Sequence, residues 1–117
     1  MDSQILDKKQ ALAQAGNNEG LAKDLFTMLL KELPVLHQLI QEACQKQQRQ
    51  AMWDHAHKLY GSTAYCGVPR LRETARELED CIKAEDDNCL TPLLEKLDGA
   101  IQELMAQGET LLKESWS

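Results

Sequence analysis

The sequence is poor in aromatic residues and in residues that interrupt helices. Aromatic residues make up 4% of the chain, which has six glycines and three prolines among 117 residues. β-Branched residues are also scarce, whereas Leu, Ala, Gln, Glu and Lys dominate. Because β-sheets rely on β-branched and aromatic side chains, this composition argues against a sheet protein. It predicts an all-helical (all-α) fold instead.

The chain also lacks an excess of basic residues and any long hydrophobic run. Its 13 Lys and Arg against 19 Asp and Glu give a formal net charge of −6, so nucleic acid is not an expected partner. No segment approaches the roughly 18 consecutive apolar residues of a membrane span, and no signal-peptide pattern is present. Direct contact with a membrane is therefore not expected. The length suits one domain with one core, over residues 1–117.

The cysteines do not form a metal-binding or disulfide pattern. They include no Cys-x-x-Cys pair and stand at Cys44, Cys66, Cys81 and Cys89. The simplest expectation is four reduced thiols in a cytosolic domain. A metal site at His55 and His57 is not expected either, because residues two apart on a helix point some 200° apart.

Hydrophobic periodicity and capping residues predict five helices. A short helix is expected after Asp7, which can cap it, and a long one over residues 19–47. The third covers residues 49–66, the fourth opens at Pro69 and the last opens at Pro92. Four long amphipathic helices with short connections predict an up-and-down four-helix bundle, with a short additional N-terminal helix.

Three regions outside the main apolar stripes carry expectations of their own. A second apolar stripe of the second helix is expected to be buried and consists of Leu21, Met28, Val35 and Leu39. The outer face of the fourth helix is expected to be solvated and consists of Arg72, Glu73, Arg76, Glu77, Glu79 and Asp80. The tail beyond Glu114, which includes Trp116, is expected to fray.

The most specific signal lies in the middle of the third helix. At 100° per residue, one inward stripe is formed by Met52, Ala56, Leu59, Thr63 and Cys66. His57 and Gly61 fall well outside it, so His57 is expected to be exposed beside a dimple at Gly61, with Trp53 and Tyr60 walling one side. A mid-helix glycine costs about 1 kcal/mol relative to alanine. Close approach of another molecule to the histidine would justify that cost; the alternative is a surface histidine beside a tolerated glycine.

Residues 57–69 read His-Lys-Leu-Tyr-Gly-Ser-Thr-Ala-Tyr-Cys-Gly-Val-Pro and resemble the signature of histidine phosphotransfer (HPt) domains. In that family the histidine is followed by Lys, an apolar residue, a basic or polar residue, Gly, and Ser or Ala. A second glycine, here Gly67, closes the segment. The Tyr-Cys-Gly-Val-Pro run is similar to the HPt modules of BarA/GacS-type hybrid sensor kinases, and the helix pattern extends the resemblance over nearly the whole chain. Tyr60 departs from the signature, since many members carry Lys or Arg there.

The resemblance implies that His57 accepts a phosphoryl group from an aspartate of a receiver domain and passes it to a response regulator. A neutral imidazole can act as the nucleophile. Lys58 is expected to stabilise the charge of the phosphoryl group, and Gly61 to leave room for the partner. Docking is expected on the helix surface around the histidine, at Trp53, Tyr60, Ser62 and Ala64.

The resemblance also implies that this chain needs no cofactor of its own. In the HPt family the partner receiver domain brings the Mg²⁺, so no metal site is expected here. The expected setting is the cytoplasmic C-terminal module of a membrane-anchored hybrid sensor kinase, which acts as a monomer.

Other functions have less support in the sequence. An ATP-dependent kinase would need a glycine-rich phosphate loop and a longer chain. A haem or di-iron bundle would need inward-facing Glu-x-x-His pairs, and a Cys–His nucleophilic site has no distinctive motif here. The remaining alternative to phosphotransfer is a non-catalytic helical docking or adaptor module.

Overall fold

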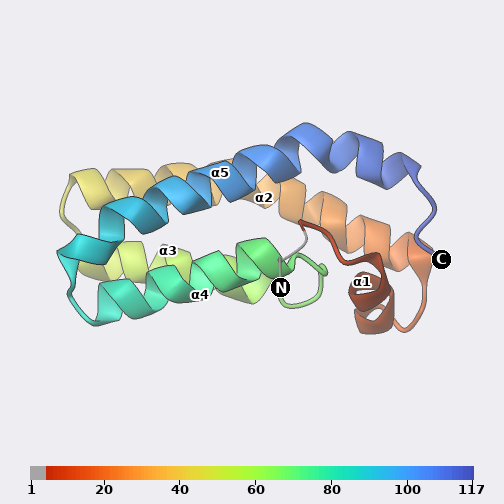
Figure 1. The fold of residues 1–117 in the computed structure, drawn as a ribbon, viewed down its shortest axis with the longest axis horizontal. Helices are drawn as coiled ribbons and strands as arrows, with labels where there is room; N and C mark the ends of the chain where they lie inside the picture. The colour runs from red at the N-terminus through yellow and green to blue at the C-terminus, as the bar shows by residue number, and fades with distance from the viewer. Residues whose placement is uncertain (1–4) are drawn as a thin grey trace.

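Five α-helices make up the computed structural model, which describes residues 5–117. The helices are α1 (Lys8–Gln14), α2 (Glu19–Gln45), α3 (Arg49–Ser62), α4 (Pro69–Lys83) and α5 (Asp87–Lys113), and no strand occurs in this range. Figure 1 shows α2 and α5 in one layer and α3 and α4 in the other. The expected all-helical fold is confirmed.

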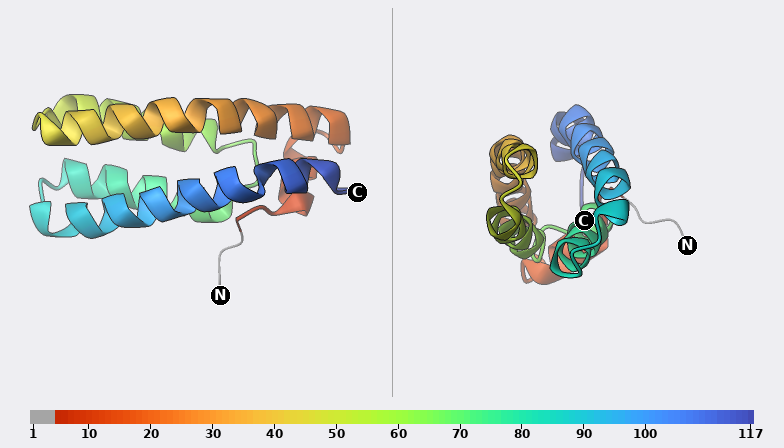
Figure 2. Two further views of the ribbon diagram at one scale, coloured as in Figure 1. Left: turned by 90° about the horizontal axis from the view of Figure 1, so that it is seen from above. Right: turned by 90° about the vertical axis from the view of Figure 1, so that its left-hand side faces the viewer.

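The four longer helices form an up-and-down bundle. Each packs against the helix that follows it, and α5 returns to pack against α2, as both views in Figure 2 show. The helices differ in length, because α2 and α5 each have 27 residues whereas α3 has 14 and α4 has 15. The short helix α1 lies beneath the part of α2 and α5 that extends beyond α3 and α4 (Figure 1).

Helix α1 is held in place through the loop that ends α3. Asp7 caps α1 by accepting a hydrogen bond from the N–H of Gln10 at 3.0 Å. The backbone N–H of Asp7 donates to the carbonyl of Gly67 at 2.7 Å. Seven residues are too few for an independent helix, so these contacts and the buried Ala11 stabilise it.

The C-terminal tail packs on the bundle, so the expectation that Trp116 frays was wrong. The Trp116 ring is 4% exposed and meets Phe26 edge to face, with ring centroids 5.7 Å apart. Its indole N–H donates to the carbonyl of Leu111 at 2.8 Å. Glu114 pairs with Lys8 at 2.6 Å, which joins α1 to the C-terminal tail. A buried aromatic ring with a bonded N–H outweighs the tendency of a terminus to fray.

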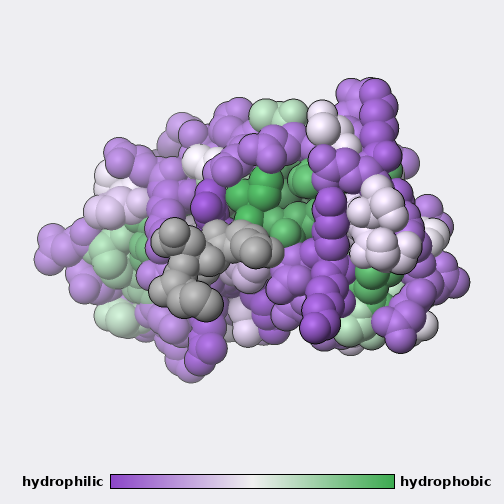
Figure 3. All heavy atoms as spheres, turned by 45° about the vertical axis from the view of Figure 1, so that its right-hand side comes forward, coloured by the Kyte–Doolittle hydropathy of each residue, from purple (hydrophilic) through white to green (hydrophobic). Residues whose placement is uncertain are grey.

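The core follows the expected apolar stripes of the helices. All five residues of the inward stripe predicted for the third helix are buried. The inward residues of α4 are buried too, and they are Leu71, Ala75, Leu78 and Ile82. In α2, Leu25 is half-buried and Phe26 is 0% exposed, and the other inward residues are buried: Ala22, Leu29, Leu33, Leu36, Ile40 and Ala43. The face of the molecule in Figure 3 is mainly hydrophilic, and hydrophobic side chains show between its ridges.

The second apolar stripe of α2 is not buried, contrary to expectation. Leu21, Met28 and Val35 are 46%, 57% and 59% exposed, and Leu39 is half-buried. The reason is the partners that α2 has: it packs against α1, α3 and α5, and the described residues supply no further helix to cover its outer side. These side chains remain at the surface.

Two further expectations at the α4–α5 connection were wrong. Helix α5 begins at Asp87, five residues before Pro92, because the Asp86 carboxylate caps it by accepting from the N–H of Asn88 at 2.9 Å. Cys81 and Cys89 form a disulfide, whereas Cys44 and Cys66 are free thiols.

Two other helices end earlier than expected. Helix α2 ends at Gln45 and α3 ends at Ser62, each a few residues before the predicted end.

Gly67 and Gly16 provide a matched pair for testing how α1 is held. Both have φ of +64°, but a Cβ on Gly67 would lie 2.6 Å from the carbonyl oxygen of Asp7, whereas one on Gly16 meets no described atom within 4 Å. We expect Gly16→Ala to cost about 1 kcal/mol of unfolding free energy from the left-handed backbone alone. Gly67→Ala should cost about 3 kcal/mol or more, because backbone must also move.

Urea unfolding followed by circular dichroism measures both values. Equal losses in the two variants would show that α1 does not pack tightly against the loop at Gly67.

Candidate functional site

Helix α3 presents His57 to solvent, as the sequence predicts. Met52, Ala56 and Leu59 are 3%, 0% and 0% exposed and fix which side of the helix faces the core. The His57 side chain is 60% exposed. The burial of the apolar stripe therefore determines the direction of the imidazole.

Two side chains hold the His57 ring in place. The Trp53 ring, one turn earlier on α3, stacks on it with centroids 4.7 Å apart and planes 9° from parallel. Glu79 reaches across from α4, and its Oε1 lies 2.5 Å from His57 Nδ1. The ring is thus fixed from two helices while most of it stays exposed.

The contact with Glu79 determines which ring nitrogen is free. An ionised carboxylate can only accept hydrogen bonds, so Nδ1 must carry the hydrogen that it donates. In the neutral ring this leaves the lone pair on Nε2, the nitrogen that Glu79 does not contact. The Glu79 side chain is only 12% exposed, so the carboxylate is held against the imidazole and not in open solvent.

Glu79 was not predicted as a site residue, and its assignment to a solvated face was wrong. Helical angles place it between the core stripe and the outer face of α4. Which residue of α4 lies opposite His57 depends on how α3 and α4 are shifted along each other. No local pattern in the sequence reports that shift.

Gly61 lies one turn beyond His57 on the exposed side of α3. A Cβ built there would meet no described atom within 4 Å, so packing inside the domain does not require glycine. Beside it a shallow cavity of about 160 Å³ lies between α2 and the end of α3, lined by Leu25, Met28, Leu29, Glu32, Gly61, Ser62, Tyr65 and Cys66. The surface next to the histidine is therefore open to close approach.

The other predicted site residues lie around His57 in different directions. Lys58 is exposed, and no ion pair within residues 5–117 includes it. Ser62 Oγ donates to Glu32 Oε2 of α2 at 2.9 Å, so this hydroxyl faces away from the imidazole. Ala64 is half-buried in the turn after α3. Of the predicted residues, Trp53 stacks directly on the His57 ring.

Arg72 places a cation beside Tyr60, the position where the HPt signature often has Lys or Arg. The Arg72 guanidinium lies 4.1 Å from the centre of the Tyr60 ring and donates to its hydroxyl at 3.0 Å. A second nitrogen of Arg72 donates to the carbonyl of Tyr60 at 3.1 Å. Arg72, expected on a solvated face, is thus half-buried against α3 and supplies a positive charge beside Tyr60.

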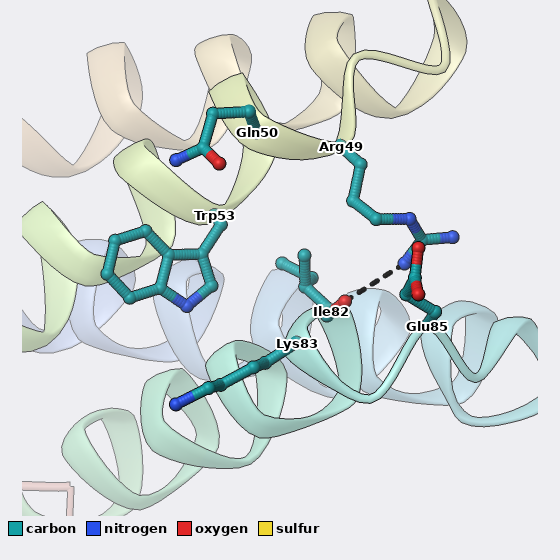
Figure 4. Close-up of a pocket in the computed structure, with 6 residues that line it drawn as sticks. All are labelled: Arg49, Gln50, Trp53, Ile82, Lys83 and Glu85. Atoms are coloured by element: carbon teal, nitrogen blue, oxygen red, sulfur yellow. Dashed lines mark hydrogen bonds between the residues drawn. The ribbon is translucent and has the colours of Figure 1, made fainter.

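A second cavity continues the groove between α3 and α4 beyond the His57–Glu79 pair. It has a volume of about 370 Å³ and is lined by Arg49, Gln50, Trp53, Ile82, Lys83 and Glu85 (Figure 4). Trp53 therefore touches both features, because its ring stacks on His57 and also forms a wall of this cavity.

Titratable groups elsewhere do not form a competing site. Burial raises the pKa of the Cys66 thiol to about 11, with a further contribution from the nearby Glu32 carboxylate. A thiol with that pKa is almost entirely protonated at neutral pH and is a poor nucleophile. Within the described chain no three His, Cys, Asp or Glu side chains come together to hold a metal ion. None of its helices is long and apolar enough to cross a membrane.

An exposed imidazole midway along one helix of an up-and-down bundle, with its second nitrogen bonded to a carboxylate, is the arrangement of a covalent histidine carrier. A family model of the Hpt domain matches residues 24–107 of the chain. The chain therefore belongs to the Hpt (histidine phosphotransfer) domain family, which confirms the resemblance found in residues 57–69.

Individual relatives agree with this assignment. The chain is 34% identical over 110 residues to the sensor histidine kinase GacS of Pseudomonas protegens, a match that covers 94% of this chain and 12% of that protein. It is 34% identical over 95 residues to the signal transduction histidine-protein kinase BarA of Escherichia coli, covering 80% of this chain and 10% of BarA. The chain thus spans about a tenth of each of these relatives.

A solved structure shows the same fold. The crystal structure of the HPT domain from a sensor hybrid histidine kinase of Shewanella matches with a TM-score of 0.85 and 27% sequence identity, over 97% of both chains. Fold and family thus agree that this is an HPt domain of the kind found in hybrid sensor kinases.

The tautomer assigned to His57 can be tested through Glu79. In Glu79→Ala the hydrogen-bond acceptor of Nδ1–H is lost, so most of the neutral ring should shift to the Nε2–H form that is usual for unrestrained histidine. Long-range ¹H–¹⁵N NMR spectra distinguish the two forms. Asp80→Ala, at an exposed carboxylate one residue further along α4, is the matched control and should keep the Nδ1–H form. The same tautomer in both variants would contradict the role of Glu79.

Proposed function

We propose that this domain is a phosphorelay intermediate in which His57 accepts a phosphoryl group from a receiver-domain aspartate and passes it to a response regulator. The observation that carries this proposal is the His57 ring itself. It is exposed, it stacks on Trp53, and Glu79 bonds Nδ1 so that Nε2 is free to react. Membership of the Hpt family supports the same conclusion.

The chemistry needs little from the domain beyond this ring. The Nε2 lone pair attacks the phosphorus of the aspartyl phosphate, an N–P bond forms, and the P–O bond to the aspartate breaks. The aspartate leaves as a carboxylate, while the imidazole becomes a phosphorylated cation that keeps its hydrogen on Nδ1. Glu79 stabilises that positive charge by accepting the Nδ1–H bond. Transfer onward reverses these steps on the aspartate of the response regulator.

Charge and access come from the residues around the ring. Lys58 is exposed without an ion-pair partner among the described residues, so it can swing toward the transferred phosphoryl group. The Arg72 guanidinium on Tyr60 adds a second cation along the α3–α4 groove. Gly61 allows the partner to approach closely, and we expect the surface at Trp53, Tyr60 and Ala64 to contact it. We expect the partner receiver to supply the Mg²⁺ required for transfer.

The relatives suggest the kind of larger protein in which this domain works. GacS and BarA are sensor kinases, and this chain corresponds to about a tenth of either. We infer that it serves as the C-terminal, cytoplasmic module of a membrane-anchored hybrid kinase. In this role it acts as a monomeric carrier without an ATP site of its own.

Phosphate transfer from a labelled, phosphorylated receiver domain tests the function directly. The wild-type domain should acquire a label that is labile in acid and stable in base, as expected for phosphohistidine. His57→Gln should acquire none. If the folded wild-type domain takes no label from any of several receivers, the proposal fails and a docking module becomes the better explanation.

Gly61 and Gly99 are a matched pair for testing whether Gly61 allows the partner to approach His57 closely. Both are exposed helical glycines around which a Cβ meets no described atom within 4 Å, but Gly99 lies on α5, away from His57. Either Gly→Glu substitution should raise helix stability by about half a kcal/mol. We expect Gly61→Glu to slow transfer by about 100-fold or more, because the carboxylate holds the partner away from Nε2. Gly99→Glu should transfer normally, and equal rates in the two variants would refute the role of Gly61.

A further inference from the structure

The disulfide between Cys81 and Cys89 connects two helices at a tight turn. Cys81 lies in the last turn of α4 and is 5% exposed, and Cys89 lies in the first turn of α5 and is partly exposed. Their Cα atoms are 6.2 Å apart, within the range that a disulfide can join without moving the backbone. The other two cysteines are separate free thiols.

The same backbone also accommodates the reduced pair. In the closed disulfide the Sγ atoms of Cys81 and Cys89 lie 3.1 and 3.2 Å from the carbonyl oxygen of Asp86. On reduction the two sulfur atoms move apart, and this carbonyl remains an acceptor within reach of the thiols. The N–H of Asp86 in turn donates to the carbonyl of Cys81 at 3.4 Å. The buried Cys81 thiol would therefore have an acceptor close by in the reduced state.

Apart from the disulfide, the turn is held by backbone hydrogen bonds from Glu85 to Ile82 and from Asp86 to Cys81, and by the side chain of Arg49. Glu85 has φ of +57°, a left-handed conformation that costs free energy for a residue other than glycine. The charged side chains of residues 85–87 are exposed. Without the disulfide, only these hydrogen bonds, in a strained and solvated connection, keep the end of α4 and the start of α5 in register.

Arg49 connects the α4–α5 turn with the cavity in the α3–α4 groove. Its guanidinium donates to the carbonyl of Ile82 at 3.0 Å and to the Asp87 carboxylate at 2.8 Å, so it binds one residue on each side of the turn. Arg49, Ile82 and Trp53 are also walls of the 370 Å³ cavity in Figure 4. A loosening of the turn would therefore change contacts of residues that line the same cavity as Trp53.

We propose that Cys81 and Cys89 are a reversible redox modification site, which reacts with small-molecule disulfides and whose closure orders the α4–α5 turn and the adjoining cavity. The more exposed Cys89 thiolate attacks the small disulfide, which forms a mixed disulfide and releases one small thiol. The Cys81 thiolate then attacks Cys89 Sγ and releases the second. Two protein thiols are oxidised to one disulfide, and the small disulfide is reduced to two thiols. In a reducing compartment the pair is open at rest and closes on oxidation.

The test uses the whole domain, first reduced with a phosphine and then treated with oxidised glutathione. Mass spectrometry should show the loss of two hydrogen atoms, with Cys81 and Cys89 joined in the peptide map. The melting temperature should rise by roughly 5–10 °C, because the closed loop restricts the unfolded chain. The two tryptophan indole signals provide an internal control in NMR spectra. Trp53 beside the cavity should shift, while Trp116 at the other end of the bundle should not.

Two variants keep the outcome unambiguous. Cys89→Ser should show neither the melting shift nor the Trp53 shift after oxidation, whereas Cys44→Ser should respond like the wild type. A stable glutathione adduct without closure would overturn the exchange mechanism. A closed disulfide that leaves the melting temperature and the Trp53 signal unchanged would overturn the ordering of the turn. Neither result depends on whether His57 carries a phosphoryl group.

Discussion

The burial of a narrow apolar stripe on α3 is the constraint on which the site depends. Met52, Ala56 and Leu59 are almost completely excluded from solvent between α2 and α4, so α3 cannot rotate without exposing them. Each fully buried large side chain contributes about 1.5–3 kcal/mol, which makes such a rotation costly. Because the helix is fixed in this way, His57 needs no interactions of its own to stay at the surface. Trp53 and Glu79 only have to orient a ring that is already outside.

Contacts from both α3 and α4 explain how the exposed His57 side chain can still be well ordered. Stacking on Trp53 restrains the plane of the imidazole, while the bond to Glu79 restrains its rotation within that plane. Trp53 covers one face of the ring, and Glu79 contacts the edge that carries Nδ1. Neither contact uses Nε2, so in the proposed transfer the orientation of the ring and access to Nε2 do not compete.

The sequence predicts what depends on local periodicity and fails where two distant segments have to be aligned. The five helices, the buried stripes and the outward direction of His57 all follow from the 3.6-residue repeat within one segment. Glu79 and Arg72 were missed because they reach α3 only through the register between two helices. The Cys81–Cys89 pair was missed for a related reason, since its spacing becomes meaningful only when α5 is known to begin at Asp87. Trp116 was missed because tail residues are ordered by tertiary contacts, which the hydrophobic periodicity of the sequence does not predict.

The meeting of α1 and the C-terminal tail has a mechanical consequence. Glu114 is bonded to Lys8, Trp116 packs on Phe26, and the N–H of Asp7 is bonded to the carbonyl of Gly67 just beyond α3. Tension on α1 is therefore shared between the C-terminal tail and the loop that follows α3. The helix that carries His57 is thereby coupled mechanically to the polypeptide that precedes α1.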